Sequence, residues 1–339
     1  MKTLLLVPVV ILLLCPMLSG QVVPKTERRG ENQALATSKQ ELAEAERLNV
    51  TVMRLYNEHK YDEALPLAKR VLEIRQKHLS EDDDLVASAL INLAEIQEAR
   101  ARHTDAQPLF ERALKAIEKS SDADDLKLAR LLDRLAVVNY SNGHPRNTER
   151  YYQRALDIRE KKLGAEHEEV ARSIYNLAEF YQFQGQYQDA EPLYKRLIAI
   201  RERNKASSES IADASVRYAC MLRKAGREDE ANELEERALE MTRPSGVGRA
   251  PIAGEVLNGR ALRLVTPSYP TMTSTSGEVQ VKILIDESGN VIRACAIKGP
   301  RAFMRASETA AYQSKFSPTK LEGKPVRVYG VIIYNFVSR

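Results

Sequence analysis

The chain has 339 residues, of which 43 % are apolar and 29 % charged, as in a soluble protein with two or three globular domains. Three cysteines are too few for a disulfide-rich fold. The net charge of +4 conceals a division, because residues from position 243 onward include 14 Lys and Arg against 6 Asp and Glu, whereas the first 242 carry a net charge of −4. This contrast predicts two units with different surfaces.

The N-terminus is typical of an export signal. Lys2 supplies the positive charge, an apolar run covers residues 4–14, and the small residues Ser19 and Gly20 suit cleavage after position 20. Residues 21–40 would then form a flexible N-terminal segment. The alternative is an uncleaved anchor, since no charge occurs between Lys2 and position 25. Both alternatives place the body outside the cytoplasm, either as a periplasmic protein or as an inner-membrane-anchored protein that faces the periplasm.

A gapless internal repeat follows. The strings YDEALPLAKRVLEIR (61–75), TDAQPLFERALKAIE (104–118), NTERYYQRALDIRE (147–160) and YQDAEPLYKRLIAIRE (187–202) place a small residue every 42 positions, and a weaker fifth copy places one after 41. These small residues are Ala64, Ala106, Thr148, Ala190 and Ala231. A fixed period of this length predicts a stack of similar units. An arginine series keeps the same register and is expected to pair between repeats or to cap helix C-termini: Arg70, Arg112, Arg154, Arg196 and Arg237.

Each unit predicts two amphipathic helices. In the fourth unit, apolar residues recur at steps of three and four from Ile174 onward, Gly185 closes a turn, and a second helix covers about 189–201. We expect Pro192 in the first turn of this second helix, where its missing N–H has no partner to lose. Aspartates at 82–84 and serines at 207–208 offer N-caps for the helices that follow them.

The 42-residue period, the Asn-Leu-Ala triplets at 92–94 and 176–178, and the string KLGAEHEEVA at 162–171 resemble kinesin-light-chain-type tetratricopeptide repeats. The resemblance implies an all-α helical-repeat superhelix, a tetratricopeptide solenoid, with about five helical hairpins over residues 41–242. Its first and fifth copies depart from the family at Thr51 and Glu235, and both copies are expected to act as polar caps of the stack.

That family binds peptides in an inner groove lined by the first helix of each hairpin. Asn92 and Asn176 match the family's asparagine that hydrogen-bonds a peptide backbone. The same surface would include further side chains of the first helices: Arg134, Tyr140, Arg172, Tyr175, Glu179 and Phe183. The alternative is that these residues form only a solvated helix face.

The C-terminal unit has the periodicity of a small α+β domain. A linker over 243–276 contains one short strand at 261–265. Residues 277–339 then predict two strands joined by a turn with Gly289, a helix over about 303–316, and a last strand over 326–337. The order β-β-α-β suits a helix packed on one face of an antiparallel sheet.

This unit resembles the TonB C-terminal domain over about 258–338. The resemblance rests on Ser-Tyr-Pro at 268–270, GEVQVKILIDESGNV at 277–291, KFSPT at 315–319 and GVIIYNF at 330–336. Members of that family add a strand of an outer-membrane transporter at a sheet edge, which marks Tyr269, Pro270, Ile333 and Asn335 as candidate partner-binding residues. The uncharged final strand is expected to be such an edge. The chain departs from the family in two features, because it lacks the family's Ala-rich helix after Pro270 and has repeats in place of a Pro-rich spacer.

No pattern of residues indicates catalysis, a cofactor or a metal site. The five histidines fall in turns and inter-repeat loops, and no G-x-S-x-G, phosphate-binding loop or C-x-x-C motif occurs. Cys220 and Cys295, one in each unit, are expected to be buried small apolar residues. The basic charge of the C-terminal unit is scattered, which argues against nucleic acid and suits an acidic peptide, an anionic surface or the chain's own acidic repeats.

These features favour a periplasmic, non-enzymatic adaptor that binds one protein in the repeat groove and another at the C-terminal sheet edge. The expected partners are proteins or peptides of the cell envelope, an outer-membrane transporter among them, with membrane contact only through an uncleaved N-terminus. One alternative is a TonB-type energy transducer for outer-membrane transport. Another is a structural envelope protein whose repeats self-associate.

Overall fold

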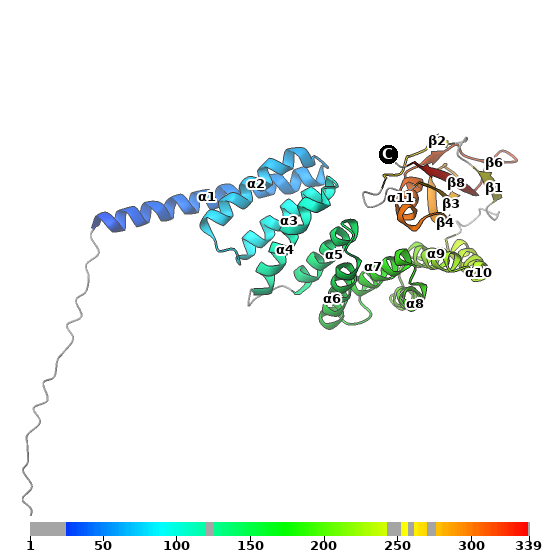
Figure 1. The fold of residues 1–339 in the computed structure, drawn as a ribbon, viewed down its shortest axis with the longest axis horizontal. Coiled ribbons are helices and arrows are strands. Elements are labelled where there is room, and N and C mark those ends of the chain that lie inside the picture. The colour runs from blue at the N-terminus through cyan, green and yellow to red at the C-terminus, as the bar shows by residue number, and fades with distance from the viewer. Residues whose placement is uncertain (1–24, 120–124, 243–251, 257–260, 270–275, 338–339) are drawn as a thin grey trace, which may run out of the picture.

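The computed structural model describes residues 25–119, 125–242, 252–256, 261–269 and 276–337. Within these ranges, ten helices form an elongated array, and a small sheet domain with one further helix lies beside its C-terminal end (Figure 1). The export signal expected at residues 1–20 and the candidate residue Pro270 fall outside the described residues.

The array consists of five helical hairpins, as the 42-residue period predicts. Their helices are α1 (Lys25–Asn57) and α2 (Tyr61–His78), α3 (Asp84–Ala99) and α4 (His103–Lys119), α5 (Asp125–Ser141) and α6 (Pro145–Leu163), α7 (Glu168–Gln184) and α8 (Tyr187–Arg203), and α9 (Ser208–Lys224) and α10 (Glu228–Met241). Each hairpin packs on the next, and one apolar core runs through the array. The small residues of the repeat, from Ala64 to Ala231, are fully buried where the two helices of a hairpin meet.

The helix boundaries follow local sequence signals. The Asp83 carboxylate accepts the Leu85 N–H at 2.8 Å, and the Ser207 hydroxyl accepts the Ser210 N–H at 3.2 Å, which confirms both expected N-caps. Gly185 ends α7 with φ of +73°, a left-handed conformation that glycine adopts without steric cost.

Two expectations about the helices are wrong. α8 begins at Tyr187, so Pro192 is inside the helix and beyond its first turn, as are the equivalent Pro66 in α2 and Pro108 in α4. The helix tolerates the missing N–H because only one carbonyl close to its N-terminus loses a helical partner. The N-terminal segment expected to be flexible is helical from Lys25 onward, since its run of Ala, Glu, Gln and Leu favours helix.

Three of the five residues of the arginine series pair between repeats, whereas Arg70 pairs with Glu44 and Glu73 of its own hairpin. Arg196 lies 2.6 Å from Glu160 of the preceding hairpin, Arg154 pairs with Glu118 in the same way, and Arg112 lies 3.0 Å from Glu81. These ion pairs are largely solvent-exposed, so each contributes at most about 1 kcal/mol. Their role is to reinforce the stacking that the buried core determines.

The C-terminal domain is built on a four-stranded sheet in the order β1-β8-β3-β4. Its elements are β1 (Ile252–Val256), β3 (Gly277–Ile285), β4 (Val291–Lys298), α11 (Arg301–Tyr312) and β8 (Val328–Phe336). Two short pairs complete it: β2 (Ala261–Arg263) with β5 (Lys315–Phe316), and β6 (Lys320–Leu321) with β7 (Lys324–Pro325). The predicted order β-β-α-β is present in β3, β4, α11 and β8.

The expectation that the last strand lies at the edge of the sheet is wrong for its first half. β8 pairs antiparallel with β3 along its whole length, and β1 pairs parallel with it from Val328 to Val331. The sequence did not indicate β1, because this five-residue segment contains a glycine and pairs with a strand far along the chain. β2, which lies in the strand expected at 261–265, belongs to a different pair.

One face of this sheet holds the domain core. Val279, Val281 and Ile283 are buried against α11, and the rings of Phe303 and Phe336 stack with their centroids 4.1 Å apart. Gly289 has φ of +84° in the turn between β3 and β4. An added Cβ there would come within 2.0 Å of the Phe316 carbonyl oxygen, so the turn requires glycine.

Candidate functional site

A groove lies across the first helices of the second, third and fourth hairpins. It has a volume of about 500 Å³ and brings together four of the eight predicted groove residues, namely Asn92 of α3, Arg134 of α5, and Arg172 and Asn176 of α7. The complete lining is Ser88, Ile91, Asn92, Glu95, Lys127, Arg130, Leu131, Asp133, Arg134, Val137, Arg172 and Asn176.

The groove combines amides with charges that are already partly paired. Asn92 donates to the Asn49 side chain at 2.9 Å, which fixes the orientation of its amide. Arg134 lies 3.5 Å from Glu95 and 3.6 Å from Glu98, distances too long for strong hydrogen bonds. A ligand with acidic or amide groups could therefore compete for this guanidinium.

The two glutamates beside Arg134 are held in a dry environment. Burial raises the pKa of Glu95 and of Glu98, and Arg134 only partly offsets this by attracting their ionised forms. The Oε2 atom of Glu98 is buried and has no hydrogen-bond partner among the described residues. Below the groove, burial also raises the pKa of Asp133, although the Arg159 guanidinium lies 2.7 Å from it and opposes this shift.

Of the four remaining predicted groove residues, Tyr175 and Tyr140 lie outside this open part. Tyr175 donates to Glu179 at 2.7 Å, and the Arg217 guanidinium stacks 4.9 Å from its ring centroid, so its polar and aromatic surfaces are both occupied. Burial raises the pKa of this tyrosine strongly. Tyr140 packs edge-on against Phe180 and lies under Arg305 of α11, with the guanidinium 5.7 Å from the ring centroid.

The C-terminal domain covers this second part of the groove. Arg305 of α11 also lies 5.5 Å from the Phe183 ring centroid and 4.0 Å from the Glu179 carboxylate, both predicted groove residues. Arg301, one turn earlier, donates to the Gln184 carbonyl at 3.0 Å at the C-terminus of α7, where a positive charge is favoured. The basic C-terminal domain therefore binds the chain's own repeats, one of the three alternatives for its charge.

The second face of the sheet is also covered by the repeats. Leu284 and Cys295, on this face of β3 and β4, are 0 % and 5 % exposed, and β4 packs on α9. Lys282 of β3 lies 3.5 Å from Glu235 of α10. The sequence position of Glu235 indicated a polar cap exposed to solvent, and this expectation is wrong. Glu235 is buried between the two units and accepts two hydrogen bonds from Arg223, at 2.8 and 3.1 Å.

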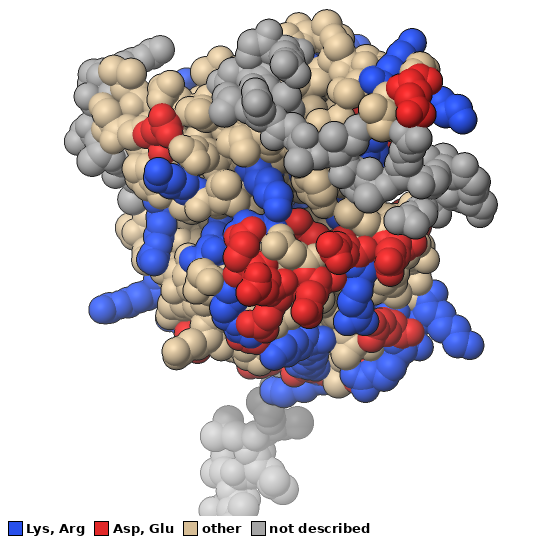
Figure 2. Space-filling view, turned by 90° about the vertical axis from the view of Figure 1, so that its right-hand side faces the viewer, with Lys and Arg blue, Asp and Glu red and all other residues tan. Residues whose placement is uncertain are grey.

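The polar cap of the array is supplied instead by the exposed face of α10. Acidic side chains gather on this end of the molecule, beside the C-terminal domain (Figure 2). The exposed acidic residues of α10 are Glu228, Asp229, Glu230, Glu233, Glu236 and Glu240. Such a surface prevents further repeats from stacking.

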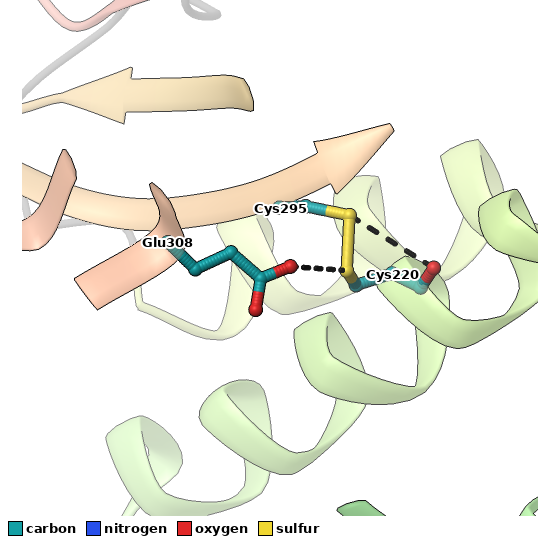
Figure 3. A group of neighbouring side chains, drawn as sticks. All are labelled: Cys220, Cys295 and Glu308. Atoms are coloured by element: carbon teal, nitrogen blue, oxygen red, sulfur yellow. Dashed lines mark hydrogen bonds between the residues drawn. A yellow bond between two sulfur atoms is a disulfide. The ribbon is translucent and has the colours of Figure 1, made fainter. Parts of the chain in front are cut away.

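A disulfide joins the two units. Cys220 of α9 and Cys295 of β4 are bonded, and their Cα atoms are 5.7 Å apart (Figure 3). Both are buried, as expected, but they are joined to each other and are not the separate small apolar residues that the sequence indicated. The sequence could not indicate the bond, because 75 positions separate the cysteines and they lie in different units.

Glu308 of α11 completes this part of the interface. It accepts hydrogen bonds from the Lys224 ammonium at 2.9 Å and from the Ala296 N–H at 2.8 Å, and its Oε1 lies 3.9 Å from the Cys220 Sγ. Ligand atoms of Cys220, Cys295 and Glu308 lie within 4.8 Å of one another. They do not fit a metal ion, because the sulfurs are bonded to each other and Lys224 neutralises the carboxylate.

The candidate residues of the C-terminal domain have separate positions. Tyr269 packs against Phe303 and Phe336, with ring centroids 5.5 and 6.1 Å apart, so it contributes to the core. Ile333 pairs with Gln280 of β3, and Asn335 is exposed near the C-terminal end of β8. The pairing of β1 with β8 reaches only as far as Val331.

A second series of arginines, in which Arg75 and Arg159 are buried and Arg201 is partly exposed, was not identified from the sequence. Arg159 is 1 % exposed and links α6 to Ser173 of α7 at 2.6 Å and to Asp133 of α5 at 2.7 Å. Arg75 and Arg201, in the same register, donate to the first turns of α3 and α9 at 2.8 Å. The signal was an Ile-Arg pair that recurs at 74–75, 158–159 and 200–201.

Comparisons with known proteins agree with this architecture. Residues 52–119, 92–161, 127–203 and 171–243 match the tetratricopeptide repeat family, and residues 266–337 match the Gram-negative bacterial TonB protein C-terminal family. A search of curated proteins finds no match. None of the described helices is long and apolar enough to cross a membrane.

Solved structures show the same helical fold. The TPR-like repeats of a Podosopora anserina protein assigned as a kinesin light chain have a TM-score of 0.54 and 22 % identity, over 59 % of this chain and 95 % of that one. BtubC (BKLC) from P. vanneervenii has a TM-score of 0.52 and 20 % identity, over 68 % of this chain and 96 % of that one. At these identities the likeness concerns the fold alone.

Proposed function

Because the chain belongs to the tetratricopeptide repeat family, we propose that it is an exported adaptor that binds an extended peptide in the groove of α3, α5 and α7. Asn92, Arg134, Arg172 and Asn176 converge on this groove from three successive repeats, and this convergence is the observation that supports the proposal most. Amides two repeats apart can both donate to and accept from a peptide backbone, and the arginines between them suit its acidic groups.

A peptide selected from a random display library against the full-length chain tests this proposal. Its affinity would be measured by fluorescence anisotropy for the native chain and for the Asn92→Ala/Asn176→Ala variant. We expect binding about tenfold weaker or more, since each lost hydrogen bond contributes about 0.5–1.5 kcal/mol. Gln153→Ala, an exposed amide on α6, is the matched control. Equal affinity for the folded double variant and the native chain would contradict the groove assignment.

The C-terminal domain would supply a second binding site by strand addition. The match to the TonB C-terminal family supports this. An incoming strand would displace β1, whose pairing with β8 covers Val328 to Val331, and would follow β8 toward Ile333 and Asn335. A synthetic peptide of residues 252–256, the β1 segment, should compete with such a strand. Binding of the groove peptide should not change when this competitor is added.

An exported, periplasmic location is part of this proposal. The Cys220–Cys295 disulfide supports it, because such bonds persist in oxidising compartments. The same bond favours an adaptor over an energy transducer, since it fixes the C-terminal domain to the repeats instead of leaving it free to reach across the envelope.

A further inference from the structure

The groove of the repeats is divided into an open and a covered part. The open part is the 500 Å³ groove of α3, α5 and α7 described above. The covered part continues it along Tyr140, Glu179 and Phe183, and α11 lies on it. A ligand that extended through the whole groove would therefore meet the chain's own C-terminal domain.

The contacts of α11 with the covered part are those of a ligand with a binding surface. Arg301 and Arg305 are four residues apart on one face of the helix, the first at the C-terminus of α7 and the second between the Tyr140 and Phe183 rings. Arg305 has a 48 % exposed side chain, so solvent weakens both of its cation–π contacts. These contacts alone do not hold a domain in place.

The bonds that hold the domain lie deeper, around the disulfide. Cys220 and Cys295 are joined next to the Lys224–Glu308 ion pair, in which Lys224 has a 3 % exposed side chain. A covalent link between residues 75 positions apart removes chain entropy from the undocked state in the loop-closure account, and so it favours docking.

We propose that α11 occupies the covered part of the groove as an intramolecular ligand, and that reduction of Cys220–Cys295 releases it and joins both parts into one groove from α3 to the C-terminal end of α7. This inference rests on the proposed peptide-binding function, whose site it extends. The freed surface fits a helical segment with arginines at positions i and i+4, the pattern that α11 itself presents.

The reduction needs a dithiol, as a small molecule or in a protein. One of its thiolates attacks a cysteine sulfur, the S–S bond breaks, and the other cysteine leaves as a thiolate that takes up a proton. The second thiol of the reagent then displaces the first cysteine and forms the reagent's own disulfide. Two electrons and two protons pass to the protein, which ends with two thiols.

The experiment uses the full-length chain in three forms: oxidised, reduced with dithiothreitol, and as the Cys220→Ser/Cys295→Ser variant. Amide exchange would be followed in residues 175–184 of α7, beneath α11, and in 105–117 of α4 as an internal control. The probe is a labelled synthetic peptide of residues 300–313, and its Arg301→Glu/Arg305→Glu form is the control. We expect amide exchange in α7 to rise at least tenfold in the reduced chain and in the serine variant. The peptide with native sequence should bind these two forms and its Arg301→Glu/Arg305→Glu control should not. The oxidised chain should bind neither peptide.

Two results would overturn the inference. Unchanged exchange in α7 after reduction would show that α11 stays docked without the disulfide. A simultaneous rise of amide exchange in α4 would show that the disulfide maintains the fold of the repeats and does not specifically hold α11 in its docked position. The Asn92→Ala/Asn176→Ala variant separates this inference from the proposed function. Reduction should raise amide exchange in α7 of this variant as much as in the native chain, whether or not those amides bind a peptide.

Discussion

The Lys224 ammonium and the Glu308 carboxylate lie 2.9 Å apart in the interface between the repeats and the C-terminal domain, with side chains only 3 % and 14 % exposed. Each comes from a different unit, and neither charge could be buried there alone. The two charges therefore compensate each other in the interface only when both units are folded and correctly docked.

A double-mutant cycle tests this dependence. Lys224→Met should lower the free energy of unfolding of the oxidised chain by about 3 kcal/mol, because it leaves the Glu308 charge buried without its partner. Adding Glu308→Leu should restore part of that loss, since no buried charge then remains, although the Ala296 N–H loses its acceptor. Lys195→Met removes one side of an exposed pair with Glu191 and should cost less than about 1 kcal/mol. Denaturant unfolding is measured for the native chain, for Lys224→Met and Glu308→Leu alone, for the double variant and for Lys195→Met. Additive costs for the two single changes would refute the coupling.

Buried Arg159 should contribute more to the free energy of unfolding than a member of the solvent-exposed arginine series such as Arg154. Arg159→Met would leave Asp133 and Ser173 without their donor, and we expect a loss of about 3 kcal/mol in thermal or denaturant unfolding. Arg154→Met, on the exposed series, is the matched control and should cost at most about 1 kcal/mol. Similar losses for the two variants would contradict the assignment of Arg159 as the link between hairpins.

The stability of the repeats should depend on pH through the groove glutamates. Burial raises the pKa of Glu98 above its usual value of 4.5, so the folded chain holds this proton more tightly than the unfolded chain. The contribution of Glu98 to the free energy of unfolding is therefore present below pH 4.5 and is lost as the pH rises through the raised folded value.

Glu98→Gln removes this titration. The free energy of unfolding of the native chain minus that of the variant should decrease between about pH 4 and pH 7, as measured by urea unfolding at several pH values. For the control Glu240→Gln, on the exposed face of α10, the free energy of unfolding of the native chain minus that of the variant should not decrease over this pH range. An increase with pH for Glu98→Gln would mean that Arg134 outweighs burial.

Export predicts a defined N-terminus. The charge at Lys2, the apolar run after it and Ser19-Gly20 predict that the mature chain begins at Gln21. The intact mass of protein isolated from the envelope fraction measures this. A mass that includes residues 1–20 would favour the uncleaved anchor.

The sequence was sufficient for the features that repeat or alternate locally. The period from Ala64 to Ala231, the caps at Asp83 and Ser207, and the order of β3, β4, α11 and β8 depend on residues close to one another in the chain. Such signals are what helix and strand periodicities record. The same signals located Asn92 and Asn176 on one surface, because the repeat fixes which helix face each occupies.

The features that the sequence did not predict depend on contacts between distant segments. Nothing local to Tyr140 indicates that Arg305 will cover it, and nothing near Glu235 indicates that the C-terminal domain will bury it. The Cys220–Cys295 bond is of the same kind. Each depends on how two separately predictable units dock, which composition and periodicity do not encode.

The pairing of β1 with β8 has a consequence for the order in which the chain can assemble. The hairpins join neighbours in sequence, so each can form as soon as its two helices have been synthesised. β1 is the next described element after α10, yet its partner β8 is the last of the described strands. The sheet can therefore be completed only after β8 has been synthesised, so the repeats can fold before the domain that covers them.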